Sequence, residues 1–259
     1  MPRFAANLSF LFQELPFLDR FEAAAAQGFK AVEFMFPYEY PAQDLRAALD
    51  KHGLALVLFN TAQGNWTAGE RGIAAIPGRD TAFDQAIEQA LQYAQVLGNS
   101  LIHVMAGLVT DGAERGAFVS NLKRAAGRAS KEGVTLVIEP INTRDMPGYF
   151  LSRTSQAINI LRDCGRPNVG LQFDLYHRHI MDGDVLAGLT EAQPFIRHMQ
   201  FASPPDRGEP DSGELDFRAL LKAIDASGYK GHIGLEYKPR GETVAGLKWM
   251  KALGVGLGS

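Results

Sequence analysis

The sequence predicts a closed (β/α)8 barrel, the TIM-barrel fold, from three observations. Short apolar runs alternate with longer segments of helical period along the chain, eight times in all, and this alternation is typical of a parallel sheet. The chain has 259 residues, which is close to the roughly 250 of one closed barrel. No stretch rich in Pro, Gly or Ser divides the chain, so we expect a single domain over residues 1–259.

The apolar runs have the length and composition of buried parallel strands. The predicted strands are residues 4–9, 31–34, 54–59, 101–105, 135–138, 169–173, 198–201 and 233–235. An open, doubly wound sheet is the alternative, and it would need a glycine-rich phosphate-binding turn after its first strand. The segment Asn7-Leu-Ser9-Phe10 contains no glycine, which favours the barrel.

Two of the predicted helices have clear boundary signals. Thr81 and Asp84 have the spacing of a capping box at the start of residues 81–97, and Gly98 follows as an expected left-handed C-terminal residue. Asp216 precedes a second apolar stripe of helical period. Further helices are predicted at residues 18–27, 41–51, 114–131, 154–162 and 243–253, and a weaker one within 182–191.

Composition and charge exclude several classes of protein. A formal net charge of −3 gives no basic field for holding nucleic acid. The single cysteine, Cys164, excludes a disulfide framework and a cysteine-based zinc cluster. We find no apolar stretch typical of a bilayer span and no secretory signal pattern near the start. We therefore expect a cytoplasmic protein that binds neither nucleic acid nor membrane.

The residues that end the apolar runs form the most informative pattern. A polar side chain lies at or near the end of each apolar run: Asn7 or Ser9, Glu33, Asn60, His103, Glu139, Asp174, Gln200 and Glu236. The carboxyl ends of barrel strands converge on one face, so these groups should share one mouth. The last four are three carboxylates and one amide, which repel unless a cation lies among them and which suit Mg²⁺ or Mn²⁺.

Each of these carboxylates has a plainer structural explanation. A carboxylate at a strand end is often a helix cap or the partner of a neighbouring arginine. The metal or acid–base interpretation rests on four consecutive βα units that end in this way.

Other polar residues are candidates for contacts with a substrate. His177 follows Asp174 by three residues, and we favour a substrate contact for it over a bond to the metal. Arg207, after the seventh strand, is placed to pair with a substrate carboxylate. Glu70 and Arg71, in the long loop after the third strand, are candidates for similar work, with a surface ion pair as the alternative.

Four segments resemble those of hydroxypyruvate isomerases, which are xylose-isomerase-like TIM barrels related to the sugar epimerases. They are Leu-Val-Ile-Glu139-Pro-Ile-Asn142, Gln-Phe-Asp174-Leu-Tyr-His177, His198-Met-Gln200 and Gly-Leu-Glu236-Tyr. Gly64-Asn-Trp66-Thr-Ala-Gly-Glu70-Arg71-Gly72 and His103-Val-Met-Ala-Gly107 add to the likeness, which extends over nearly the whole chain. Relatives that act on four-carbon 2-oxo acids share these segments.

The resemblance implies a divalent metal and assigns its ligands. The metal would be Mg²⁺, with Mn²⁺ or Co²⁺ as alternatives, and the ligands would be Glu139, Asp174, Gln200 and Glu236. Glu139 and Glu236 would also form the acid–base pair, and His103 would join the substrate-binding residues. Epimerase relatives carry His in place of Gln200, and an oxygen ligand there favours Mg²⁺. Endonucleases on this barrel use more histidine for several zinc ions and need a basic surface, which this chain lacks.

The implied reaction interconverts hydroxypyruvate and 2-hydroxy-3-oxopropanoate (tartronate semialdehyde). The C3 proton is a weak acid, so the reaction needs a base and a Lewis acid that stabilises the enediolate. We expect Glu139 and Glu236 to move the proton, and the order in which they act stays open. A 2-oxo-tetronate isomerase, a ketose 3-epimerase and a non-catalytic protein that binds metal and sugar acids are the alternatives.

The expected partner is therefore a small hydroxy acid, oxo acid or sugar. Association of like subunits through the outer helices also stays open, since barrels of this type often form homo-oligomers.

Overall fold

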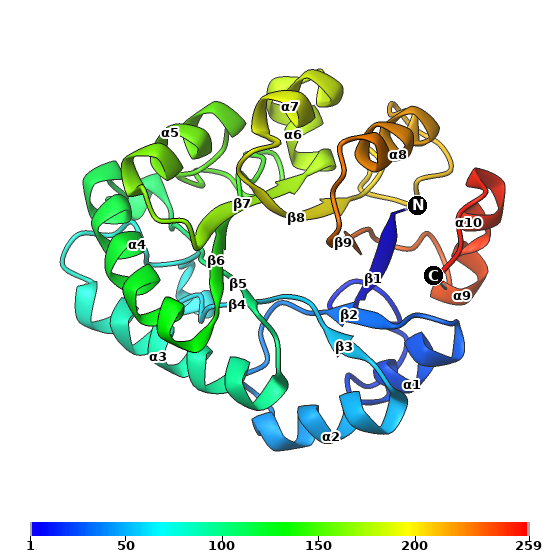
Figure 1. Cartoon of the computed structure of the whole chain (residues 1–259), viewed down its shortest axis with the longest axis horizontal. Coiled ribbons are helices and arrows are strands. Elements are labelled where there is room, and N and C mark those ends of the chain that lie inside the picture. The colour runs from blue at the N-terminus through cyan, green and yellow to red at the C-terminus, as the bar shows by residue number, and fades with distance from the viewer. Residues whose placement is uncertain (1, 258–259) are drawn as a thin grey trace.

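The computed structural model describes residues 2–257 and shows a ring of strands enclosed by helices (Figure 1). All strand pairs are parallel, in the order β3-β2-β1-β9-β8-β7-β6-β5-β4. The strands are β1 (Arg3–Asn7), β2 (Ala31–Glu33), β3 (Ala55–Leu56), β4 (Phe59–Asn60), β5 (Leu101–His103), β6 (Thr135–Ile138), β7 (Val169–Asp174), β8 (Ile196–Phe201) and β9 (His232–Leu235).

The ring closes because β3 and β4 are two parts of one extended segment. β3 pairs with β2, β4 pairs with β5, and only Val57 and Leu58 separate them. The Val57 N–H donates to Val32 O at 2.9 Å, and the Phe34 N–H donates to Leu58 O at 3.2 Å, so pairing continues through the gap. When this segment is counted once, the described residues form eight barrel strands, and the predicted (β/α)8 fold is confirmed.

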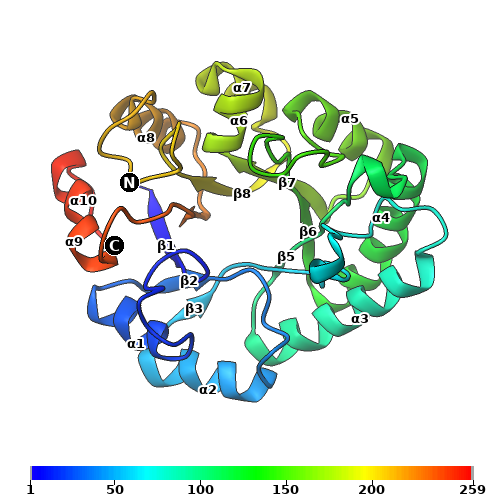
Figure 2. The same cartoon turned by 180° about the vertical axis from the view of Figure 1, so that it is seen from behind.

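Helices surround the ring on its outside, as the view from behind also shows (Figure 2). They are α1 (Asp19–Ala26), α2 (Ala42–His52), α3 (Asp80–Leu97), α4 (Arg115–Ala129), α5 (Thr154–Cys164), α6 (Leu175–Asp182), α7 (Val185–Ala192), α8 (Phe217–Ala226), α9 (Thr243–Gly246) and α10 (Lys248–Leu253). Single 3-10 turns are η1 (Trp66–Ala68), η2 (Val109–Asp111) and η3 (Ser130–Glu132). Among the described residues, no helix has the length and apolar character needed to cross a bilayer.

The buried faces of the helices join the outward side chains of the strands in one apolar core. At the seam between the two ends of the chain, Trp249 of α10 packs edge-on against Phe4 of β1, with ring centroids 5.9 Å apart. The last helix therefore lies against the first strand, and the packing of the ring is continuous there.

The capping box predicted for α3 is wrong. The helix begins at Asp80, and no side chain caps its first turn. Asp84 instead accepts hydrogen bonds from Arg124 at 2.8 Å and from Arg128 at 3.1 Å, both on α4. The carboxylate is drawn to two cations on a neighbouring helix, and Thr81 is left as an ordinary exposed residue of the first turn.

The helix α6 lies almost entirely outside the ranges predicted to be helical. It begins directly after β7, where Asp174 Oδ1 accepts the N–H groups of Tyr176 at 2.7 Å and His177 at 3.0 Å. The weak helix expected within residues 182–191 is α7. The side chain of Asp216 caps α8, as predicted, by accepting the Ala219 N–H at 3.1 Å.

We expect Asp216→Ala to lower the free energy of unfolding by about 1 kcal/mol, because the first turn of α8 loses its cap. Thr81→Ala is the matched control and should change it by less than about 0.5 kcal/mol, since Thr81 caps nothing. Urea denaturation of both variants measures the difference. Equal losses in the two variants would contradict the assignment of the cap.

Candidate active site

Several of the predicted site residues line one cavity at the carboxyl ends of the strands. The cavity has a volume of about 110 Å³, and its lining includes His103, Glu139, His177, Arg207 and Glu236. Glu139 is 4% exposed and Glu236 is 7% exposed. The two carboxyls expected to form an acid–base pair therefore face the same small, enclosed space.

Burial raises the pKa of three carboxyls around this cavity. The pKa of Glu139 lies well above its usual value, first because of desolvation and then because of repulsion from Glu236 and Asp174. Desolvation raises the pKa of Glu236 to about 8, although the positive charge of Arg207 opposes the rise. Desolvation also raises the pKa of Asp174, again against Arg207. Carboxyls that are desolvated together in this way favour a cation among them.

The donor atoms present fit a divalent cation. Glu139, Asp174 and His177 each offer a ligand atom, and these atoms lie within 4.8 Å of one another. Glu139 Oε1 and Asp174 Oδ2 are buried and have no hydrogen-bond partner. A buried carboxylate oxygen without a partner is costly, and a hard cation would satisfy both oxygens. Asp174 can serve two purposes, because its other oxygen caps α6.

His177 is arranged as a hydrogen-bond donor toward the cavity. Its Nδ1 accepts the Asn142 backbone N–H at 3.4 Å and lies 2.6 Å from the Asn142 side-chain amide. Desolvation lowers the pKa of His177 well below its usual value, so the ring is neutral. Because Nδ1 accepts, the single ring proton is on Nε2, which lies 3.8 Å from Glu139 Oε1. This tautomer supports contact with a substrate oxygen.

His103 also lines the cavity, and its imidazole is free to bond a ligand. Both of its ring nitrogens are buried without a hydrogen-bond partner, and Nδ1 lies 3.7 Å from Glu139 Oε2. Desolvation lowers the pKa of His103 to about 3. A neutral imidazole in this position can donate one hydrogen bond and accept another from a bound ligand.

A hydrogen-bond network inside the barrel holds Glu236. Its Oε2 accepts from Asn7 Nδ2 at 2.9 Å and from Gln200 Nε2 at 2.7 Å. The same two nitrogens donate to Glu33 Oε1, at 3.0 Å and 2.7 Å. Both carboxyl groups accept from Gln200 Nε2, so the nitrogen side of the Gln200 amide points toward them.

The other end of the Gln200 amide is also occupied. Gln200 Oε1 accepts from Gln172 Nε2 at 2.5 Å. In this arrangement Gln200 donates to Glu236, and its expected role as a metal ligand stays a prediction.

The strand-end pattern assigns Glu33 no chemical role, yet Glu33 is central to this network. Its Oε2 lies 2.7 Å from His198 Nε2, and both side chains are completely buried. Gly234 makes room for it, because a Cβ there would lie 2.1 Å from Glu33 Oε1. The signal that was missed is the alternation of barrel strands: Gln172 and His198 each lie two residues before a strand-end residue and so face the same interior.

Arg207 lies over the cavity with its guanidinium between two aromatic rings. Its carbon Cζ is 4.7 Å from the centroid of Phe10 and 5.2 Å from that of Tyr176. Nη2 pairs with Glu236 Oε1, and Nη1 lies 3.3 Å from Asp145 Oδ2. A guanidinium held in this way supplies the positive charge that a substrate carboxylate needs.

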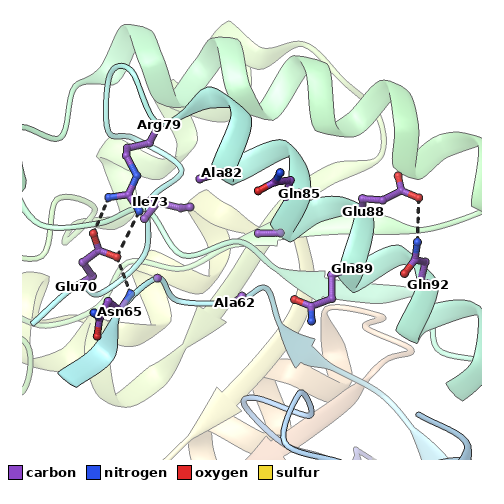
Figure 3. A pocket seen from close by; sticks show the side chains of 12 residues that line it. Ala62, Asn65, Glu70, Ile73, Arg79, Ala82, Gln85, Glu88, Gln89 and Gln92 are labelled. Atoms are coloured by element: carbon purple, nitrogen blue, oxygen red, sulfur yellow. Dashed lines mark hydrogen bonds and ion pairs between the residues drawn. The ribbon is translucent and has the colours of Figure 1, made fainter. Parts of the chain in front are cut away.

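Glu70 and Arg71 are not among the residues that line this cavity. Glu70 lies in a surface groove beside α3, where its carboxylate accepts from Arg79 at 2.5 Å and from the Asn65 N–H at 2.6 Å (Figure 3). The Arg71 guanidinium lies 3.7 Å from the centroid of the Trp66 ring. The structure thus gives these two side chains partners within their own loop.

Comparison with known proteins places the chain in a family. A family model described as xylose isomerase-like TIM barrel matches residues 21–253. The chain belongs to the xylose isomerase-like TIM barrel family. It is 53% identical over 255 residues to a 2-oxo-tetronate isomerase of Cupriavidus necator, covering 97% of this chain and 98% of the relative. It is 44% identical over 254 residues to the hydroxypyruvate isomerase of Escherichia coli, covering 96% and 98%.

A solved structure of this family agrees with the barrel. The crystal structure of an AP endonuclease, family 2, from Brucella melitensis superposes with a TM-score of 0.94 at 46% identity, covering 97% of this chain and 99% of that one. The resemblance inferred from the strand-end segments is thereby confirmed at the level of the family.

The raised carboxyl pKa values predict how the stability of the metal-free protein depends on pH. Between the usual pKa of 4.5 and the folded-state value of about 8, Glu236 binds more protons in the folded state than in the unfolded state. The free energy of unfolding should therefore fall as pH rises from about 7 to about 8 and then level off. Glu139 acts in the same direction.

Thermal unfolding in the presence of a chelator measures this effect. The window lies above the usual histidine pKa of 6.5, so the buried His103 and His177 do not add to the slope. Glu236→Gln should show a shallower fall in melting temperature than the unchanged protein. A melting temperature that rises through this window would refute the expectation.

Proposed function

We propose that this protein is an isomerase that moves a hydrogen between C2 and C3 of a short 2-oxo-3-hydroxy acid, with hydroxypyruvate as its substrate and tartronate semialdehyde as the product. One observation carries the proposal: Glu139 and Glu236 face one cavity of about 110 Å³ that also contains the guanidinium of Arg207. An acid, a base and a carboxylate-binding cation are the groups that this reaction requires.

The relatives support this class of substrate. Hydroxypyruvate isomerase is the name of the Escherichia coli relative, and a relative in Mus musculus, 48% identical over 261 residues, is named as a putative hydroxypyruvate isomerase. The 53% identity to a 2-oxo-tetronate isomerase favours a four-carbon acid as the second candidate. The two substrates differ only by a hydroxymethyl group on C3, and the hydrogen shift is the same.

Proton transfer at carbon is assigned to the two glutamates. One carboxylate removes the C3 proton, the resulting enediolate spreads its charge over O2 and O3, and a carboxyl group returns a proton to C2. The hydroxyl proton passes from O3 to O2, so atoms and charge balance. Burial raises the pKa of Glu139 well above its usual value and that of Glu236 to about 8, which suits groups that both take and give protons.

Other side chains would orient the substrate. Arg207 binds its carboxylate, and the Nε2 proton of His177 donates to a substrate oxygen, since Nδ1 is engaged by Asn142. His103 offers a further hydrogen bond. The network through Asn7 and Gln200 keeps Glu236 in place while its protonation changes.

A divalent cation completes the proposed site. Glu139 and Asp174 would hold it through the two oxygens that have no hydrogen-bond partner. When bound, it supplies Lewis-acid stabilisation of the charge that develops on the substrate oxygens. Because the donors are carboxylate oxygens, we propose Mg²⁺, with Mn²⁺ and Co²⁺ as substitutes.

We also propose a cytoplasmic location, with a small hydroxy acid, oxo acid or sugar as the partner and with neither nucleic acid nor membrane bound. The one cysteine, Cys164, is free and buried, which fits a reducing compartment. Self-association through the outer helices stays a prediction.

Glu139→Gln and Glu236→Gln should each lower turnover of hydroxypyruvate by about 10²–10⁴-fold, because each loses a positioned acid or base. Glu88→Gln, an exposed change on α3, is the control and should keep full activity. Steady-state rates of proteins with unchanged melting temperature measure the effect. Near-normal turnover in either site variant would remove that residue from the role.

Proton exchange separates the isomerase from a protein that only binds metal and sugar acids. In D₂O an isomerase labels C2 or C3 of the acid, whereas a binding protein leaves these hydrogens unexchanged. Absence of label with bound substrate would favour the binding protein.

Removal of divalent cations by a chelator should abolish turnover and lower the melting temperature, and both should recover with added Mg²⁺. At a cation concentration of about 100 times its Kd, the stabilisation is about 2.7 kcal/mol. Asp174→Asn should lose most of the cation-dependent rise in melting temperature, because one of the two unpartnered oxygens becomes an amide. Full activity in the chelated protein would contradict the Lewis-acid part of the proposal.

A further inference from the structure

The segment from Gly64 to Gly72 contributes one side chain to the cavity. That side chain is Trp66, the first residue of η1. Trp66 is 40% exposed, and its ring centroid lies 6.1 Å from that of Phe36, which also lines the cavity. Trp66 is thus a wall between the cavity and the surroundings of the protein.

Arg71 packs against Trp66. Its guanidinium carbon lies 3.7 Å from the centroid of the indole. Its Nη1 donates to Trp66 O at 3.2 Å and to Glu70 O at 2.8 Å. Arg71 therefore contacts both the ring and the backbone of the residue that forms the wall.

Asn65 and Glu70 close the 3-10 turn that carries Trp66. Asn65 Oδ1 accepts from the Ala68 N–H at 3.1 Å and from Thr67 Oγ1 at 2.8 Å. Glu70 Oε2 accepts the Asn65 N–H at 2.6 Å, and Glu70 is itself held by Arg79 (Figure 3). The turn is therefore tied at its start and its end.

Two glycines bring this turn close to its neighbours. Gly64 has a φ of 82°, and a Cβ on it would lie 2.2 Å from Glu70 Oε2. Gly72 has a φ of 108°, and a Cβ on it would lie 2.5 Å from Met105 O. Only glycine allows both the left-handed backbone and the close approach.

Trp66 and Arg207 lie on opposite sides of the mouth. Trp66 follows the third strand segment, and Arg207 follows β8, the seventh, so three strands lie between them in either direction around the ring. An acid whose carboxylate pairs with Arg207 and whose C2 and C3 lie between the two glutamates extends its remaining carbons toward Trp66. The cavity of about 110 Å³ is well below the roughly 300–1,000 Å³ of sites for larger ligands.

We infer that Trp66 sets the upper limit on substrate length, and that Glu70 and Arg71 are positioning residues that hold its ring as the end wall of the cavity. The inference deepens the proposed function and rests on it for the placement of the carboxylate and the reacting carbons. It also gives Glu70 and Arg71 a purpose other than direct contact with the substrate.

Turnover of acids of increasing length tests the inference. Trp66→Ala should raise the ratio of kcat/KM for five- and six-carbon 2-oxo acids to that for hydroxypyruvate by at least about tenfold, as expected when an apolar wall worth about 1–3 kcal/mol is removed. Trp66→Phe should give an intermediate ratio. Val109→Ala, which shortens an exposed apolar side chain outside the cavity, is the matched control and should leave the ratio unchanged.

Arg71 distinguishes positioning from direct binding. Arg71→Met should shift the ratio in the same direction as Trp66→Ala but by less, with little change in KM for hydroxypyruvate. If Arg71 instead bound the substrate carboxylate, Arg71→Met would raise KM for every acid alike and leave the ratio unchanged. That result would overturn its role as a positioning residue.

Tryptophan fluorescence supplies a readout that does not depend on turnover. Of the two tryptophans in the chain, Trp249 is 1% exposed in the core, so a response to ligands in the cavity reports on Trp66. Glycerate and threonate, acids of three and four carbons without the carbonyl, are unreactive probes. Threonate should change the fluorescence more than glycerate, and Trp66→Phe should respond to neither.

The two experiments separate failure of the inference from failure of the proposed function. If no acid is turned over but threonate still changes the Trp66 fluorescence, the isomerase proposal is refuted, and the role of Trp66 as the end wall of the cavity is retained. The other outcome is that hydroxypyruvate is turned over, and that a Trp66→Ala protein with an unchanged melting temperature keeps the original preference for substrate length. That outcome would refute the role of Trp66 as the end wall and would leave the isomerase proposal intact. No fluorescence response to either probe in the unchanged protein would also refute the wall.

Discussion

The burial of three neighbouring carboxyls is the constraint around which this barrel mouth is arranged. Glu139, Asp174 and Glu236 are desolvated beside one another, and their pKa values rise as a result. Each compensating feature acts on that charge: the guanidinium of Arg207, the amide donors on Glu236 and the helix end on Asp174. Two oxygens still have no partner, and they are where a cation would act most strongly.

Glu33 and His198 form a second layer of polar side chains inside the barrel. Glu33 shares both amide donors of Glu236 and pairs with His198, and Gly234 leaves space for its carboxylate. A mutation in this layer would reach the site through Asn7 and Gln200. The layer therefore links barrel packing to the position of Glu236, and precision in that position is what proton transfer at carbon demands.

The loop that carries Trp66 is held in place by different interactions from those that hold the strand ends. Strand ends are held rigidly by the barrel, whereas a long loop must organise itself through local contacts. Here Asn65, Glu70 and Arg71 use their polar groups within the loop, and only the indole reaches the cavity. The charged residues of this loop therefore stabilise the loop itself, and the single apolar side chain of Trp66 is the part that acts on the cavity.

The sequence by itself determined the eight strands, the barrel, most of the helices and the polar residue at each strand end, because these follow from periodicity and from chain position along parallel strands. The partners of those residues were decided only by the tertiary structure. Asp84 accepts hydrogen bonds from two arginines on α4 and does not cap α3. Glu33 pairs with His198 across the barrel, and the Arg71 guanidinium lies against the Trp66 ring. Hydrogen bonds and ion pairs depend on distances between segments far apart in the chain, and those distances exist only once the ring of strands has closed.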